Sequence, residues 1–292
     1  MHKKLRKIQT IIDPTPVVEG AGVRLKRSLG GEKLNYLDPF LLFDHFGSPH
    51  AEDYQAGFPM HPHRGIETVT YMLAGKVQHR DTLGNAGSIG AGDVQWMTAG
   101  GGILHEEMPQ VCPEGNGGFQ LWVNLPARLK MTQPRYQDIS SREIPEVIAA
   151  DGAKVRVIAG NVAGTDGAVT GIAANPTYLD VFIPPGRSFT QSIPQGHTAF
   201  AYVFDGKGVF VEDDEGSQKL IAQTKLVVWE DGDLVKIVTG EEAVRLLLIS
   251  AQPLGEPIAR YGPFVMNTKE EISQALLDLK QGTFIWKEQA RS

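Results

Sequence analysis

Short apolar runs, bounded by glycine, proline and other turn-forming residues, cover the chain up to about residue 250. Each run is as long as one strand and is rich in β-branched or aromatic residues, as in β-sandwiches and β-barrels. The clearest runs are 67–73, 119–124, 179–183, 199–204 and 245–249. This pattern predicts an all-β fold for most of the chain.

Only the C-terminal stretch has helical periodicity. Asn267 or Thr268 can cap a helix there, Thr268 and Glu271 have the spacing of a capping box, and Gly282 lies where a left-handed terminator is expected. One face of this helix carries the apolar residues Ile272, Ala275, Leu276 and Leu279. We expect this stripe to dock on the protein's own surface.

The chain reads as two halves. Polarity rises and apolar periodicity stops over residues 138–145, which predicts a linker between a first domain, 1–137, and a second domain, 146–292, that carries the helix. An internal repeat agrees with this division, because Tyr71, Gly75 and Lys76 align with Tyr202, Gly206 and Lys207 at an offset of 131. A further match of Gly92-Asp93 with Gly232-Asp233 at an offset of 140 places an insertion in the loop 211–219. We therefore expect two copies of one β-barrel unit.

Composition narrows the functional classes. The net charge is −6, which gives no electrostatic footprint for direct nucleic-acid binding. No apolar run approaches the length of a membrane-spanning helix, and the basic start of the chain lacks the apolar run of a secretory signal. The single cysteine, Cys112, favours a reducing compartment. We expect a cytoplasmic protein, or a nuclear one if the source is eukaryotic, with no membrane partner.

The candidate chemistry starts at His61-Pro62-His63. Residues two apart on a strand point to the same face, so both imidazoles can converge on one point. Proline is tolerated at a strand edge or a strand start, and Pro62 fixes the local backbone.

A second polar cluster follows the glycine-rich stretch 98–102. By the same parity His105 and Glu107 share a strand face, and Glu106 points away. If this segment lies beside the first one in a barrel, three imidazoles and one carboxylate can surround a metal ion, with bonds of about 2.0–2.2 Å.

At this point the sequence resembles a known family. His61, His63 and Glu67 followed by Gly75 resemble the first cupin motif, and Gly92-Asp93 through His105 resembles the second. Several longer runs resemble the pirin family of two-cupin proteins and occur in its order: 37–44, 57–65, 95–100, 120–125, 262–267 and 270–275. The resemblance implies a bicupin, that is, two tandem jelly-roll barrels of the double-stranded β-helix type followed by a C-terminal α-helix.

The pirin resemblance also implies a ligand set. It assigns iron to the N-terminal barrel and makes His61, His63, His105 and Glu107 the metal ligands, with Glu67 beside the site or structural. The second copy has Ser192, Pro194 and Thr198 at the positions of His61, His63 and Glu67, and Arg245 and Leu247 near those of His105 and Glu107. These residues cannot assemble a site, so we expect the C-terminal barrel to be free of metal. His197 is out of phase and is expected to be a surface or structural histidine.

Such a site leaves coordination positions for substrate. Nitrogen and oxygen ligands suit Fe(II), although Mn, Co, Ni, Cu or Zn also fit such a site. Pirin-like proteins are associated with quercetin 2,3-dioxygenase activity, so we expect an oxidoreductase that acts with O₂ on a flavonol or on another enediol or catechol. Glu107, or alternatively Glu67, would accept the substrate proton. Phe58, Trp96, Phe119 and Trp122 are candidates for a flat apolar pocket.

Two other functions use the same ligands. Animal pirins are iron-dependent transcriptional cofactors, and bacterial relatives are linked to metabolic enzymes, so the chain could be a redox-sensing module that contacts a transcription factor or a metabolic enzyme. A non-redox metal enzyme such as an isomerase would polarise a substrate oxygen and need no O₂.

Overall fold

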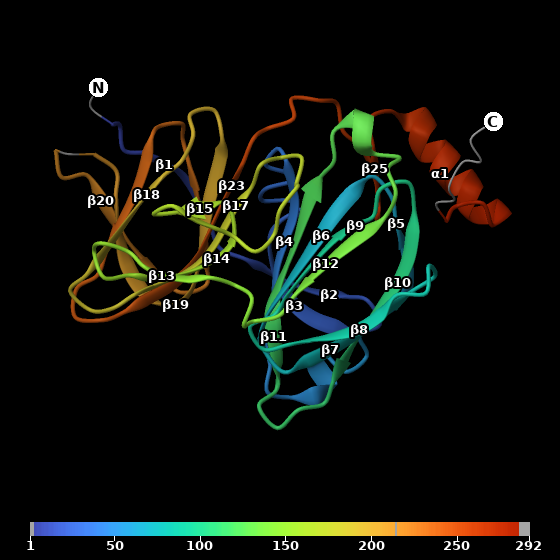
Figure 1. Cartoon of the computed structure of the whole chain (residues 1–292), viewed down its shortest axis with the longest axis horizontal. Helices are drawn as coiled ribbons and strands as arrows, with labels where there is room; N and C mark the ends of the chain where they lie inside the picture. The colour runs from blue at the N-terminus through green and yellow to red at the C-terminus, as the bar shows by residue number, and fades with distance from the viewer. Residues whose placement is uncertain (1–2, 214, 286–292) are drawn as a thin grey trace. The chain divides into compact units, whose positions relative to one another are not determined.

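The computed structural model describes residues 3–213 and 215–285, and almost all regular structure in it is β (Figure 1). The chain divides into two compact units. The first barrel comprises residues 15–141 and 254–292, and the second barrel comprises residues 1–14 and 142–253. The boundary between residues 141 and 142 falls inside the predicted linker at 138–145.

The first barrel contains a large and a small antiparallel sheet. The large sheet has the order β12 (Arg135–Ile139), β9 (Val94–Thr98), β6 (Ile66–Ala74), β11 (Asn116–Asn124), β4 (Phe40–Ser48), β3 (Val23–Leu29), β2 (Thr15–Glu19). The small sheet has the order β5 (Phe58–His63), β10 (Ile103–Gln110), β7 (Lys76–Asp81), β8 (Ala86–Gly90). Short 3₁₀ turns at Ala51–Asp53 and Ala127–Leu129 lie in its loops.

The second barrel has one extended sheet system around an apolar core. Its main path is β1 (Ile8–Ile12), β21 (Lys225–Trp229), β19 (Thr198–Val211), β23 (Val244–Ala251), β17 (Thr177–Ile183), β14 (Lys154–Ala159), β13 (Glu146–Ile148). Strands β20 (Gln218–Ala222) and β22 (Leu234–Val238) pair with β19, and β18 (Ser188–Ser192) pairs with β22. A small hairpin, β15 (Asn161–Val162) with β16 (Thr165–Asp166), lies beside it. The two jelly-roll barrels expected from the sequence are confirmed.

The internal repeat is real at the offset of 131. Strand β6 lies between β9 and β11, and the corresponding part of β19 lies between β21 and β23. The glycines that follow the repeated tyrosines, Gly75 and Gly206, both have positive φ, 72° and 67°, a conformation that glycine adopts without steric cost.

The match at an offset of 140 is wrong. Gly92-Asp93 precedes β9, whereas Gly232-Asp233 precedes β22. Strand β22 pairs with β18 as β10 pairs with β5, so β22 and β10 are the equivalent strands. The structural counterpart of His105 therefore lies in β22 and not at Arg245. Glycine-aspartate turns recur in β proteins, and this one precedes a different strand in each half.

The ends of the chain are exchanged between the two units. Strand β1 pairs with β21 in the second barrel, and the C-terminal segment joins the first barrel. That segment contains the hairpin β24 (Ala259–Tyr261) and β25 (Phe264–Met266) and the helix α1 (Lys269–Gln281). This differs from the expected division, which kept residues 1–14 with the first half and the helix with the second half. Long-range pairing decides the placement, and local sequence patterns do not report it.

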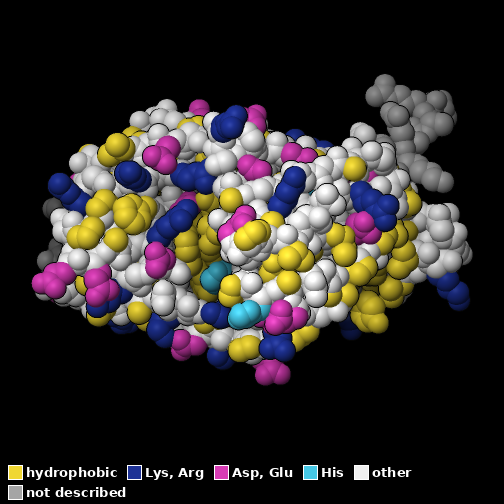
Figure 2. Space-filling model, turned by 90° about the horizontal axis from the view of Figure 1, so that it is seen from below, with side chains coloured by type: hydrophobic (Ala, Val, Ile, Leu, Met, Phe, Trp, Pro, Cys, Tyr) yellow, Lys and Arg dark blue, Asp and Glu magenta, His cyan; other side chains and the backbone are white. Residues whose placement is uncertain are grey.

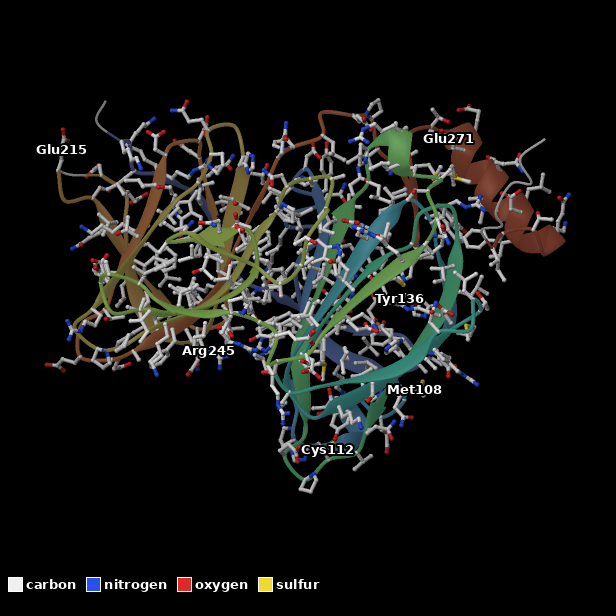
Figure 3. All side chains as sticks on the ribbon, viewed as in Figure 1. Met108, Cys112, Tyr136, Glu215, Arg245 and Glu271 are labelled. Carbon is white, nitrogen blue, oxygen red and sulfur yellow. The ribbon has the colours of Figure 1, made fainter. Side chains whose placement is uncertain are left out.

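The helix forms as predicted and docks through a narrow stripe. Thr268 and Glu271 make the reciprocal hydrogen bonds of a capping box, and Gly282 ends the helix at φ 72° (Glu271 is labelled in Figure 3). Ala275 is buried and packs in a cluster with Phe264 and Phe284. The predicted stripe is only partly docked, because Leu276 and Leu279 are each 37% exposed.

No helix in the described ranges 3–213 and 215–285 is long and apolar enough to cross a bilayer. Basic and acidic side chains are interspersed on the face drawn in Figure 2.

Candidate metal centre

Strand pairing brings the two predicted histidine segments together. Strands β5 and β10 are antiparallel neighbours, with His61 directly opposite His105 and His63 opposite Ile103. Opposite residues of a pair share one face of the sheet, and so do residues two apart on one strand. The three imidazoles therefore converge, with ring centroids 4.5–5.1 Å apart. Strand β5 is an edge strand, which explains why Pro62 is tolerated in it.

The ring nitrogens of the three histidines are close enough together to bind one metal ion. The Nε2 atoms of His61 and His63 are 3.1 Å apart, and one ligand atom from each of the three histidines lies within 4.8 Å of the others. In the described part of the chain neither ring nitrogen of His105 has a hydrogen-bond partner, although this residue is only 1% exposed. Buried polar atoms are normally paired, so these nitrogens are suited to a cation.

Burial keeps two of the rings neutral. It lowers the pKa of His63 well below its ordinary value, and the neighbouring imidazoles of His105 and His61 lower it further. Burial likewise lowers the pKa of His105, with smaller contributions from His61 and His79. The neutral imidazole is the form that ligates metals, so the protein presents ligands that need not lose a proton first.

Glu107 lies in the same cavity but is not part of the three-histidine cluster. Its Oε1 accepts a hydrogen bond from the Thr70 hydroxyl at 3.2 Å, and Thr70 also contacts Gln120 Oε1 at 2.9 Å. The pairing of β5 with β10 shifts between His105 and Glu107, because the extra residue lies on β5 between Phe58 and His61. Strand β10 itself stays regular there in its pairing with β7. Its neighbour Glu106 forms an ion pair with Arg80, a side chain that is 67% exposed.

Glu67, the second candidate for a catalytic carboxylate, lies elsewhere. It is 2% exposed, and its Oε1 accepts a hydrogen bond from Thr98 Oγ1 at 2.8 Å. It does not line the cavity described below, whereas Thr70, which has the opposite parity on β6, does. Burial raises the pKa of Glu67, partly offset by the hydrogen bond from Thr98. This placement suits a structural carboxylate.

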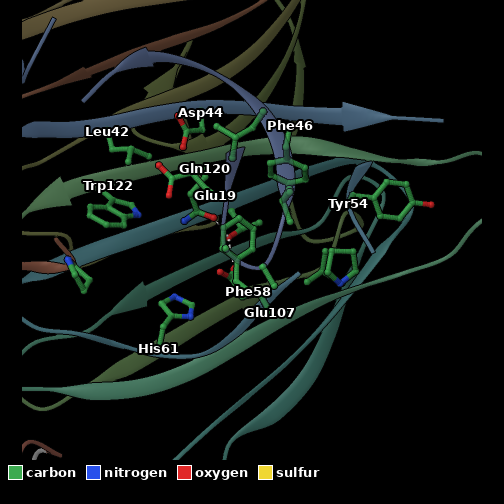
Figure 4. Close-up of a pocket in the computed structure, with 18 of the residues that line it drawn as sticks. Glu19, Leu42, Asp44, Phe46, Tyr54, Phe58, His61, Glu107, Gln120 and Trp122 are labelled. Carbon is green, nitrogen blue, oxygen red and sulfur yellow. Dashed lines mark hydrogen bonds between the residues drawn. The ribbon is translucent and has the colours of Figure 1, made fainter. Parts of the chain in front are cut away.

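A cavity of about 600 Å³ opens beside the histidines within the first barrel (Figure 4). Its volume is in the range of small-molecule sites. His61, His63 and Glu107 line it together with Phe58 and Trp122. The Trp122 ring stands edge-on to His63, with centroids 5.1 Å apart.

Two of the four aromatic residues proposed for the pocket are core residues instead. Trp96 and Phe119 are 1% and 0% exposed and do not line the cavity. Phe119 stacks against Phe43 and Tyr71, with ring centroids 5.7 and 6.4 Å apart. Since β9 and most of β11 are buried on both faces, their sequence does not reveal which face lines the cavity.

Charged residues that the sequence analysis missed form another part of the wall. Arg27 holds Asp44 through two hydrogen bonds of 2.9 and 2.7 Å and Glu19 through one of 2.7 Å. Burial raises the pKa of Asp44, although Arg27 opposes this. A signal was present in the sequence: Arg27 is in phase with Val23 and Leu25, which also line the cavity. A charge at such an inward position is a candidate for function.

Arg260 is the second cavity arginine, and it is paired differently. Its Nη1 and Nε donate to the carbonyls of Leu41 and Gly262 at 3.1 and 3.3 Å. Its guanidinium carbon lies 5.1 Å from the centroid of the Trp122 ring. Among the residues that the structure describes, no carboxylate lies within ion-pair distance of Arg260. It is therefore a cation on the cavity wall that can meet an anionic group.

The second barrel is filled where the first is hollow. Its buried cluster is apolar and includes Phe189 of β18 and Val235 and Ile237 of β22, the strands equivalent to β5 and β10. His197 is partly buried in a loop, where its carbonyl accepts a hydrogen bond from Arg6 Nη1 at 2.8 Å. Burial and the positive charge of Arg6 lower the pKa of His197.

Comparison with known proteins agrees with these observations. Residues 22–123 match the Pirin family profile, and residues 178–285 match the profile of the Pirin C-terminal cupin domain. Human pirin is 46% identical over 268 residues, which cover 90% of this chain and 88% of human pirin. A pirin-like protein of Caulobacter vibrioides is 42% identical over 281 residues, which cover 96% of this chain and 99% of the relative.

A solved structure is similar over the same range. The crystal structure titled quercetin 2,3-dioxygenase from Acinetobacter baumannii superposes with a TM-score of 0.84 at 36% identity, covering 96% of this chain and 98% of that one. Two cupin barrels, a buried histidine cluster in one of them and full-length similarity to several relatives lead to one conclusion. The chain belongs to the pirin family.

Proposed function

We propose that this protein is an iron-dependent dioxygenase that acts with O₂ on a flavonol or on another enediol or catechol. The observation that carries the proposal is the convergence of His61, His63 and His105 beside a cavity of substrate size. Two of these histidines, His61 and His63, line the cavity together with the carboxylate of Glu107. The similarity to a structure titled quercetin 2,3-dioxygenase supports the same substrate class.

The donor set fits Fe(II) among the divalent metals. His61, His63 and His105 would supply three neutral nitrogen ligands, and we propose Glu107 as the oxygen ligand. Bound Fe(II) would supply Lewis acidity and the capacity to react with O₂ at positions that the protein leaves open. Three neutral imidazoles and one carboxylate leave a divalent ion with a net charge of about +1, which favours an anionic ligand.

The residues of the cavity can bind and deprotonate such a substrate. Glu107 lies on the cavity wall, two residues from His105 in the sequence. Its carboxylate could accept the proton of a substrate hydroxyl. Thr70 donates a hydrogen bond to it and so holds its orientation. Phe58 and Trp122 supply apolar surface for an aromatic ring, and Arg260 supplies a positive charge for an enolate or phenolate.

The test is turnover by the iron-loaded protein. Oxygen uptake should accompany loss of the flavonol absorbance, with one O₂ consumed per molecule of product, and both should disappear when iron is removed. Turnover that persists without O₂ would favour a non-redox metal enzyme. If the iron-loaded protein shows no turnover but binds a protein partner in only one oxidation state of the iron, the interaction module would be favoured.

A further inference from the structure

One buried cation, the guanidinium of Arg64, anchors the end of β5, the strand that carries His61 and His63. Arg64 directly follows the ligand His63, and its side chain is 4% exposed. The guanidinium donates to the carbonyls of Gly101 and Phe284 at 2.7 and 2.9 Å and to Asp278 Oδ2 at 2.6 Å. It also lies over the Phe284 ring, 4.3 Å from the centroid. All three nitrogens of the guanidinium are thus used.

These contacts join three segments that are distant in the sequence. Gly101 lies just before β10, the strand that carries His105, while Asp278 lies in α1 and Phe284 follows that helix. The main chain reinforces the junction, because Gly65 N donates to Gly100 O at 2.8 Å and Val265 N donates to Arg64 O at 3.1 Å.

A second buried cation completes the junction. Lys130 is 1% exposed, and its Nζ donates to the carbonyls of Gly65 and Val265, each at 2.9 Å, and to Asn124 Oδ1 at 2.7 Å. The end of β5 is therefore held to the start of β10 and to the C-terminal segment at the same time.

We propose that the C-terminal segment from β25 through α1 to Phe284 is a latch that sets the metal affinity of the site, with Arg64 as its positioning residue. The inference rests on the metal site of the proposed function. Arg64 fixes the backbone between His63 and the segment that leads to His105, and ligands held in place lose less freedom when they bind a metal. Binding and docking are then linked: metal should tighten the helix, and an undocked helix should weaken the metal.

The test uses Co(II), whose visible absorption reports ligand geometry, on the full chain. Asp278→Asn removes the charge that faces Arg64, and Arg64→Lys keeps the charge but removes the planar set of donors. The matched control is Asp180→Asn in the second barrel, where Arg245 Nη2 also meets a buried carboxylate oxygen at 2.6 Å. Competition with a chelator gives the affinity, and melting of the metal-free protein shows how far each variant is destabilised.

We expect both latch variants to weaken Co(II) binding by about tenfold and to change its absorption spectrum, as is usual when residues that support metal ligands are altered. The control should lose stability and keep its Co(II) affinity. Hydrogen exchange should show that Co(II) slows exchange across 269–281 in the wild type and does so less in Asp278→Asn.

Two results would overturn the inference in different ways. If the wild type binds Co(II) and both latch variants bind it as tightly as Asp180→Asn does, the latch is refuted while the proposed metal site stands. If the wild type does not bind Co(II) at all, the proposed metal site fails and the latch fails with it.

Discussion

His105 is the direct cross-strand partner of His61, and this single pairing brings the two histidine segments together. The two residues belong to separate motifs in the sequence, and only the antiparallel register of β5 and β10 makes them neighbours. His63 joins them because it is two residues further along the same strand. The geometry of the cluster is thus a consequence of strand register and parity.

Replacing one member should remove the metal and keep the fold. His105→Ala deletes a buried ring whose nitrogens have no hydrogen-bond partner in the described structure, so no protein hydrogen bond is lost with it. We expect stoichiometric iron binding to disappear while circular dichroism stays that of a β protein. The matched control is His50→Ala, an exposed histidine that does not line the cavity. Unfolding of the His105→Ala variant, or collapse of the wild type on chelation, would contradict this prediction.

The two candidate carboxylates can be separated by a pair of isosteric variants. Glu107→Gln removes the cavity carboxylate that lies two residues from His105 and should lower kcat by about 10²-fold or more, as for loss of an acid–base group. Glu67→Gln changes a carboxylate that is buried away from the cavity and bonded to Thr98, so kcat should stay within about threefold. Steady-state kinetics of the iron-loaded variants decides between them. The opposite order of effects would assign catalysis to Glu67.

Arg260 should contribute to substrate binding through charge. Arg260→Met keeps an unbranched side chain and removes the cation over Trp122, so we expect KM for an ionised flavonol to rise about tenfold, equivalent to about 1.4 kcal/mol. Arg80→Met serves as the control, because it removes an exposed arginine that does not line the cavity. Unchanged KM in Arg260→Met would exclude the arginine from substrate recognition.

The metal-free protein should lose stability on mild acidification. Burial lowers the pKa of His63 and His105 in the folded state, so below the ordinary histidine value of about 6.5 the unfolded chain binds protons that the folded protein does not. Stability is therefore complete above about pH 6.5 and falls as the pH drops toward the folded-state values. Each group can contribute up to about 1.4 kcal/mol per pH unit.

Urea unfolding of the metal-free protein between pH 7.5 and 5.5 measures this effect. The pH dependence should be shallower in His105→Ala, which has lost one of the histidines whose pKa is lowered by burial. A dependence as steep in this variant as in the wild type would show that other residues cause it.

The fold and the histidines could be predicted because each rests on short-range patterns. Strand-length runs bounded by glycine and proline correspond to β6, β11, β17, β19 and β23. Strand parity predicted the shared face of His61 and His63, and a capping box predicted the start of the helix. These patterns depend only on the backbone period and on neighbouring residues.

The missed features depend on which face of a strand meets the cavity. All residues of β9 and most of β6 are buried, so no alternation of polar and apolar residues marks the cavity side. For this reason the sequence does not distinguish Trp96 from the residues that line the cavity, and it does not separate Glu67 from Glu107 as a catalytic candidate. On β3, where the alternation is clear, Arg27 could have been identified as a cavity residue. The exchange of the chain ends has no local signal at all.

The most direct test of the central claim is a crystal structure of the iron-loaded protein with anomalous diffraction measured at the iron absorption edge. We expect one strong peak in the first barrel, within bonding distance of nitrogens from His61, His63 and His105, and none in the second barrel. An iron-loaded crystal with no anomalous peak between these three side chains, or with the three rings turned away from one another, would contradict it.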